Sequence, residues 1–148
     1  MKVSVIIPVY NNEKYVQTAL ESLDRQGIEN LEAIIINDGS EDSSGDVIDA
    51  FVQTHDYAIK IDQPNRGVSA ARNAGLDIAT GDYVGFLDAD DRYTDHALEQ
   101  MLALAVEKDA DLVVGEARNV RTLQESTLIQ SRDLSLKEEI SRDDPDLI

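Results

Sequence analysis

Three aspartates close together have the clearest potential for chemistry in this chain. Asp88, Asp90 and Asp91 directly follow the apolar run at 83–87. Crowded carboxylates repel one another unless a positive charge lies nearby, so this cluster is suited to holding a cation. Magnesium and manganese take one or two protein carboxylates and complete their coordination with water and substrate phosphates. On this cluster alone, an aspartate-rich turn that caps the next helix is an equal alternative.

Two further polar clusters follow apolar runs earlier in the chain. Residues 8–12 lie at the end of the run at 3–9, and residues 37–40 lie at the end of the run at 31–37. The carboxyl ends of parallel strands meet at one edge of a sheet, where ligands of open α/β sheets bind. The three clusters are therefore predicted to converge on one rim.

Several other kinds of site are excluded by the sequence. It contains no phosphate-binding P-loop, no dinucleotide-binding glycine fingerprint and no nucleophile elbow. A calcium-binding EF-hand loop is disfavoured because Arg92 and Tyr93 stand where it needs a ligand and a glycine. A bound phosphate would then depend on a metal and on arginine. Arg66 and Arg72 flank the start of a predicted helix, although solvated surface positions are an alternative for both.

The elements that position these clusters alternate regularly along the chain. Strands are expected at 3–9, 31–37, 57–61, 83–87 and 111–115. Helices are expected from Asn11 or Asn12 to Gly27, from a weak capping box of Ser43 and Asp46 through Val52, and at 68–79 and 95–108. Short connections between alternating strands and helices predict an α/β fold with a mostly parallel sheet flanked by helices.

Composition restricts the partners of this chain. It has 148 residues, with 30 acidic and 13 basic side chains that give a formal net charge of −17. Such a charge repels nucleic acid and anionic membrane surfaces. The chain has no cysteine, and no apolar run approaches the ~20 residues of a membrane span. A cytoplasmic location is expected, with membrane association of a full-length protein left open.

The polar clusters, taken in order, match the pattern of a known family. The matching residues are Pro8-Val9-Tyr10-Asn11, Asn37-Asp38-Gly39-Ser40, the run from Asn65 to Asn73, Gly81-Asp82-Tyr83 and the run from Phe86 to Asp91. In this order and spacing the chain resembles a family 2 glycosyltransferase of the GT-A (nucleotide-diphospho-sugar transferase) fold. The resemblance covers about residues 1–116. It departs from the family at Asn37, where relatives often have Asp.

The resemblance implies a site for a nucleotide-diphospho-sugar, most commonly a UDP-sugar. It implies that Pro8, Val9, Tyr10 and Asn11 lie against the nucleotide base and that Asp38 accepts a hydrogen bond from it. Arg72, helped by Arg66, would hold the nucleotide. Asp88 and Ala89 would lie near the ribose, and Asp88 and Asp90 would bind a divalent manganese or magnesium ion, Asp90 as the direct ligand.

The implied reaction transfers a sugar, usually with inversion, to a hydroxyl of a carbohydrate or lipid-linked acceptor. Cell-surface polysaccharide assembly is the usual setting of similar proteins. Residues 1–117 are expected to form the donor-binding domain, and residues 118–148 an incomplete start of the acceptor half or a mobile tail. No base motif is present, so the general base is expected beyond Ile148, and a surface exposed by truncation is expected to favour self-association.

Two alternatives remain beside this interpretation. One is a non-catalytic nucleotide-binding or regulatory module of the same fold, which the missing base motif would suit. The other is a nucleotidyltransferase, which would need a glycine-rich basic loop where this chain has Tyr10-Asn11-Asn12-Glu13. The glycosyltransferase and the non-catalytic module of the same fold both require Asp38 and Asp90 to face one cleft.

Overall fold

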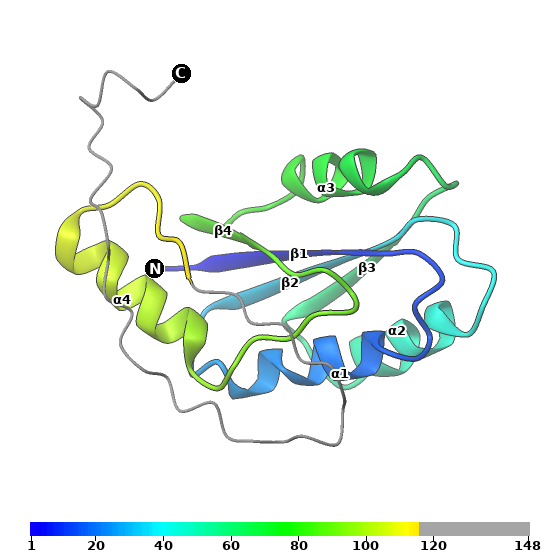
Figure 1. Ribbon diagram of the computed structural model, residues 1–148, viewed down its shortest axis with the longest axis horizontal. Helices are drawn as coiled ribbons and strands as arrows, with labels where there is room; N and C mark the ends of the chain where they lie inside the picture. Colours follow the sequence, from blue (N-terminus) through cyan, green and yellow to red (C-terminus); the bar gives the residue numbers. More distant parts are fainter. Residues whose placement is uncertain (116–148) are drawn as a thin grey trace.

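The structure, a computed structural model, describes residues 1–115 as a parallel sheet with helices on both faces (Figure 1). The elements in chain order are β1 (Val3–Val9), α1 (Val16–Glu21), the 3₁₀ helix η1 (Leu23–Arg25), β2 (Leu31–Asn37), α2 (Ser44–Val52), β3 (Ala58–Asp62), α3 (Val68–Leu76), β4 (Tyr83–Phe86) and α4 (Ala97–Lys108). The predicted α/β class is confirmed.

The sheet has the strand order β3-β2-β1-β4, and every pair is parallel. Val9 pairs with Asn37, and Asn37 pairs with Asp62, so three strands end at the same edge. All of β1 and the last five residues of β2 are buried. Burial on both faces explains why these strands appear in the sequence as unbroken apolar runs.

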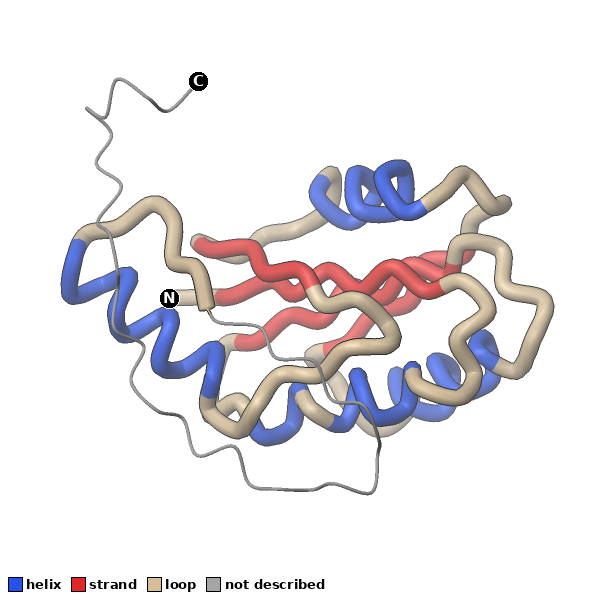
Figure 2. Tube along the Cα trace, viewed as in Figure 1, coloured by secondary structure: helices blue, strands red, loops and turns tan. Residues whose placement is uncertain are grey.

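Alternate side chains of the strands point to opposite faces of the sheet and belong to two separate hydrophobic cores. Val5, Ile7 and Ile35 belong to the core beneath α1, α2 and the start of α4, whereas Ile6 and Ile34 pack beneath α3. Figure 2 shows α3 alone on its face of the sheet and the other helices on the opposite face. Helices therefore cover both faces of the sheet, and the carboxyl-terminal edge of the sheet remains accessible to a ligand.

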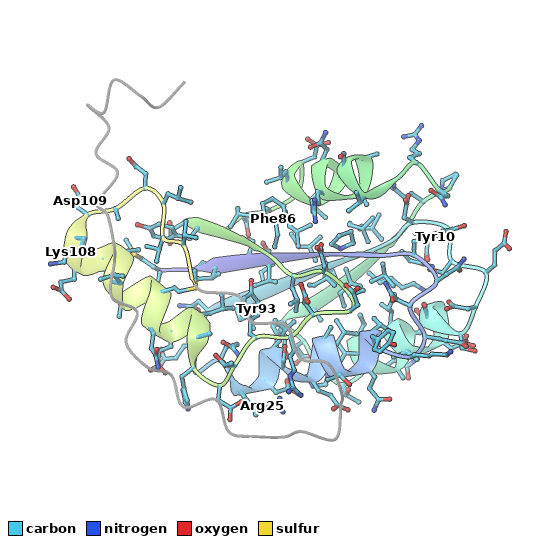
Figure 3. All side chains as sticks on the ribbon, viewed as in Figure 1. Tyr10, Arg25, Phe86, Tyr93, Lys108 and Asp109 are labelled. Atoms are coloured by element: carbon cyan, nitrogen blue, oxygen red, sulfur yellow. The ribbon has the colours of Figure 1, made fainter. Side chains whose placement is uncertain are left out.

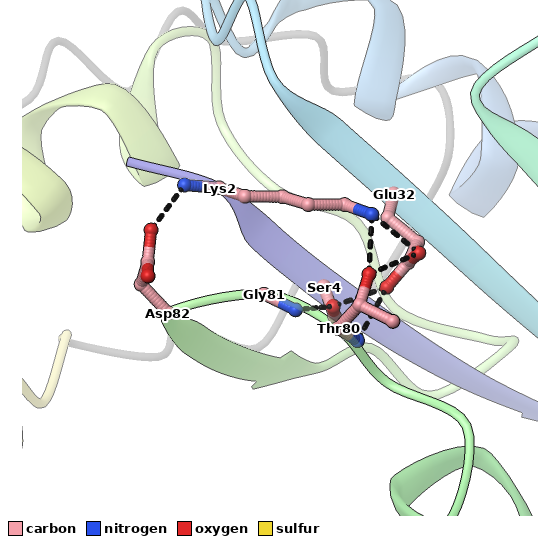
Figure 4. Close-up of polar contacts among 6 residues, drawn as sticks. All are labelled: Lys2, Ser4, Glu32, Thr80, Gly81 and Asp82. Atoms are coloured by element: carbon pink, nitrogen blue, oxygen red, sulfur yellow. Dashed lines mark hydrogen bonds and ion pairs between the residues drawn. The ribbon is translucent and has the colours of Figure 1, made fainter.

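A network of polar contacts closes the opposite, amino-terminal edge of the sheet (Figure 4). Glu32 on β2 accepts hydrogen bonds from Lys2, Ser4 and Thr80. Ser4 in turn accepts one from the Gly81 amide at 2.8 Å. These contacts tie β1 and β2 to the segment that leads into β4, and we call this set of residues the Glu32 network.

The prediction of a fifth strand at 111–115 is wrong. These residues form no strand, and Leu112 and Val114 are each 70% exposed. A strand needs a neighbouring strand and a buried face, and within residues 1–115 nothing pairs with the outer side of β4. The expected acceptor half or tail at 118–148 lies outside the described residues.

Two helix starts also differ from the prediction. The capping box of Ser43 and Asp46 does not form, since α2 has no side-chain cap bond from Ser43. Instead Asp42 accepts a hydrogen bond from the Ser44 amide at 2.9 Å. The first helix is shorter than expected, because α1 begins at Val16 and η1 ends before Gly27. Among the described residues, no helix has the length and apolar character needed to cross a bilayer.

Candidate functional site

A cleft of about 360 Å³ lies at the carboxyl ends of β1, β2 and β4 and beside the start of α3. Asp38 and Asp90 both line it, as the prediction of a shared rim requires. Tyr10 marks this end of the molecule in Figure 3, far from Asp109 at the end of α4. The residues that line the cleft are Pro8, Val9, Tyr10, Asn12, Asp38, Asn65, Gly67, Val68, Ala71, Arg72, Asp88, Ala89 and Asp90.

Asp38 is buried in the floor of this cleft and bound to the loop that precedes α3. Its side chain accepts hydrogen bonds from the Gln63 amide at 2.7 Å, the Arg66 backbone N–H at 2.9 Å and the Gly67 backbone N–H at 2.8 Å. Burial alone would raise the pKa of Asp38, but these three donors outweigh it and lower the pKa. Asp38 is therefore a carboxylate that holds one wall of the cleft in place.

The loops after β1 and β2 are joined by reciprocal hydrogen bonds. Asn11 accepts one from the Glu41 amide at 2.8 Å, while its own amide donates to Ser40 at 3.1 Å. Three more contacts join the Asn12 amide to Ser44, the Glu13 amide to Asp42 and the Ser43 amide to Glu13. Asn11 has a positive φ of 49°, which asparagine tolerates better than most residues. The rim that carries Tyr10 is thereby preorganised.

Arg72 on α3 reaches across the cleft to the loop after β4. Its Nη2 lies 2.6 Å from Oδ1 of Asp88, and its guanidinium lies 5.8 Å from the centre of the Phe86 ring. Its buried Nε has no hydrogen-bond partner among the described residues. Arg72 therefore supplies a positive charge and a spare N–H donor beside the aspartate cluster, as binding of an anionic group would require.

The aspartate cluster carries uncompensated negative charge despite Arg72. Burial raises the pKa of Asp91, and the charges of Asp90 and Asp88 raise it further. No group of three or more histidine or acidic side chains within 1–115 is arranged to enclose a metal. Asp88 and Asp90 nevertheless fit magnesium or manganese, which use one or two carboxylates and take their other ligands from water and phosphate.

Most of the predicted site residues meet in the cleft. Pro8, Val9, Tyr10, Asp38, Arg72, Asp88, Ala89 and Asp90 line it. Asn11 and Arg66 are not among the lining residues: the Asn11 side chain bonds the loop after β2, and Arg66 meets Asp38 through its backbone. The lining residues not named as site residues from sequence are Asn12, Asn65, Gly67, Val68 and Ala71. Several lie in the run 65–73, whose small residues and turn at Gly67 were an available signal.

Comparison with known proteins identifies the family. Residues 4–141 match the glycosyl transferase family 2. The chain belongs to this family. It is 41% identical over 114 residues to glycosyltransferase GlyA of Streptococcus pneumoniae, an alignment that covers 77% of this chain and 16% of that protein. The chain therefore spans only a small part of the length of GlyA.

Solved structures of glycosyltransferases share the fold. S. aureus TarS in complex with UDP-GlcNAc superposes with a TM-score of 0.68 and is 31% identical over 72% of this chain and 32% of that chain. The mannosyltransferase PcManGT of Pyrobaculum calidifontis, solved with GDP-Man and Mn²⁺, has a TM-score of 0.65 and 28% identity, over 77% of this chain and 34% of that chain. The GT-A fold expected from the sequence is thus confirmed for this family 2 glycosyltransferase domain.

Proposed function

We propose that this family 2 domain binds a UDP-sugar in the cleft and takes part in transferring the sugar to a hydroxyl of a carbohydrate or lipid-linked acceptor. The observation that carries the proposal is that Asp38, Arg72 and Asp90 line one cleft. Complexes of related folds with UDP-GlcNAc and with GDP-Man and Mn²⁺ support a nucleotide-sugar ligand. Residues 1–117 are proposed as the donor-binding domain, with 118–148 beginning the acceptor half.

Different residues of the chain would bind different parts of the nucleotide-sugar donor. Pro8, Val9 and Tyr10 offer a surface for the base, beside the carboxylate of Asp38. Arg72, with its spare Nε–H, would donate to the diphosphate. The first backbone N–H groups of α3 lie at Val68 and also favour an anion.

Asp90 and Asp88 would hold a manganese or magnesium ion against the diphosphate. When bound, the ion would supply Lewis-acid neutralisation of the charge that develops on the leaving diphosphate. The charge of Asp88 is partly balanced by Arg72, whereas Asp90 forms no ion pair with any residue within 1–115, so Asp90 is the better candidate for the direct ligand. We propose inversion at the sugar and assign the general base to no described residue.

Calorimetry of the 148-residue chain with UDP and Mn²⁺ tests this function. Asp90→Asn removes one negative charge from the cleft and is expected to weaken UDP binding at least tenfold when Mn²⁺ is present. Asp109→Asn, at the exposed end of α4 in the left-handed conformation that asparagine accepts, is the matched control and should change affinity less than twofold. Equal affinities for the parent chain and Asp90→Asn would refute the metal site.

A sugar-transfer assay separates the enzyme from the non-catalytic module of the same fold. Turnover of UDP-sugar by the chain, either to an acceptor or to water, supports an active domain. Tight binding without any turnover supports the non-catalytic alternative for this chain, which the missing base motif favours. In both cases the donor-binding assignment stands on the calorimetry.

We also propose that the chain self-associates through the uncovered face of β4. Val84 and Phe86 are 40% and 45% exposed on the face where α3 packs mainly against β1 and β2 and reaches β4 with Arg72, which lies against the Phe86 ring. The outer edge of β4 pairs with no other strand among residues 1–115, although the Phe86 carbonyl accepts a hydrogen bond from the Tyr93 hydroxyl at 2.9 Å. An edge without a partner strand can pair with a second copy. The net charge of −17 opposes this contact, which makes it dependent on salt.

A further inference from the structure

The hydrogen bonds of Asp38 restrict what its carboxylate can recognise. A carboxylate has about four acceptor positions, two on each oxygen. Oδ1 accepts from Gln63 Nε2 at 2.7 Å and from the Arg66 amide at 2.9 Å, which fills both of its positions. Oδ2 accepts from the Gly67 amide at 2.8 Å, which fills one of its two. One acceptor position is left, on a residue that is 2% exposed.

From this count we infer that Gln63 is a specificity-determining residue that limits the nucleotide base to one with a single N–H donor, a uracil-type imide. This inference rests on the proposed function and adds the residue that selects the base. Gln63 does not line the cleft and acts through Asp38, because its amide occupies the oxygen that a second donor of the base would need.

The other bases fit this arrangement poorly. Guanine presents two adjacent donors, a ring N–H and an amino group, and it pairs with a carboxylate through both oxygens at once. With Oδ1 filled, one of these donors would be buried without a partner. Cytosine and adenine present an accepting ring nitrogen beside their amino group, which the charge of Asp38 repels. The imide of uracil needs one acceptor only.

The test compares UDP and GDP binding, with Mn²⁺ present, to the 148-residue chain and to two variants. Gln63→Met keeps the length of the side chain but removes its donor, and so frees a position on Oδ1. Gln53→Met, at the exposed end of α2, is the matched control. The ratio of the two affinities is the quantity read, because a general loosening of the loop would weaken both ligands together.

The parent chain and Gln53→Met are expected to bind UDP at least tenfold more tightly than GDP. In Gln63→Met this ratio should fall by about tenfold, the value of one hydrogen bond to a buried charge. A probe that needs no variant is UDP methylated at N3, which keeps both carbonyls but lacks the imide donor; it should bind the parent chain at least tenfold more weakly than UDP.

Three results would overturn the inference: equal UDP and GDP affinities in the parent chain, an unchanged ratio in Gln63→Met, or N3-methyl-UDP that binds as tightly as UDP. Failure of the proposed function has a different signature, since the parent chain would then bind neither UDP nor GDP. Circular dichroism of each variant establishes that the compared proteins are folded.

Discussion

Substitution of Glu32 by Gln should destabilise the fold in a pH-dependent manner. The Glu32 side chain is 16% exposed and accepts hydrogen bonds from Lys2, Ser4 and Thr80 at the amino-terminal edge of the sheet (Figure 4). Burial would raise its pKa, but the donors, Lys2 foremost, lower the pKa from 4.5 to about 2. Glutamine keeps the shape of the side chain and loses the charge on which these contacts depend.

The pKa difference sets the size and the direction of the effect. A fall from 4.5 to about 2 corresponds to at most about 3 kcal/mol of folding free energy. Solvent around Lys2, whose side chain is 38% exposed, reduces this, so we expect about 1–2 kcal/mol. Because the folded-state pKa is the lower one, the stabilisation is complete above about pH 5 and is lost as the pH falls toward 2.

Urea unfolding followed by far-ultraviolet circular dichroism measures the effect at a series of pH values. At pH 7 the Glu32→Gln variant should be about 1–2 kcal/mol less stable than the parent chain, and by pH 3 this gap should shrink by roughly half. Glu29→Gln, at an exposed position just before β2, is the matched control and should have little effect at either pH. A gap that is absent at pH 7, or equally large at pH 3, would refute the reasoning.

Three other changes have defined outcomes. Gly75→Ala would place a Cβ 2.5 Å from Cγ2 of Ile6, so urea unfolding should show a loss of about 1–3 kcal/mol, and an unaltered midpoint would contradict the close packing of α3. Gly39→Ala combines a φ of +74° with a Cβ 2.7 Å from the Asn65 amide, so calorimetry should show at least tenfold weaker UDP binding; full affinity would mean that the loop before α3 does not shape the site. Light scattering should show a mass that increases from low to high salt and stays monomeric in Val84→Asp, and a salt-independent monomer of the parent chain would disprove self-association.

The strands were the most predictable part of the fold. Residues 3–9 and 31–37 were predicted with the bounds that the structure has, because a strand buried on both faces leaves an unbroken apolar run. Residues 111–115 have a similar pattern but form no strand. Strand formation depends on a neighbour that the local sequence does not specify, and the outer side of β4 offers none within the described residues.

The location of the site was predictable, but the hydrogen bonds that shape it were not. Polar residues after parallel strands had to meet at one rim, and Asp38 and Asp90 do line one cleft. The partners of Asp38 come from residues 63–67, and those of Asn11 from the loop after β2. Neither pairing leaves a local sequence signal, since each depends on how two loops distant in sequence come together.

The carboxylates of the cleft fall into two groups with different roles. Asp38 is buried, its pKa is lowered, and three of its acceptor positions are committed to the loop before α3. Asp88 and Asp90 are accessible, and after burial their charges are the further cause that raises the pKa of the neighbouring Asp91. Hydrogen bonds already stabilise the first carboxylate, whereas the second group gains most from an added cation. A divalent ion should therefore bind at Asp88 and Asp90 and leave Asp38 to select the base, so loss of the metal and loss of base selectivity should be separable by mutation.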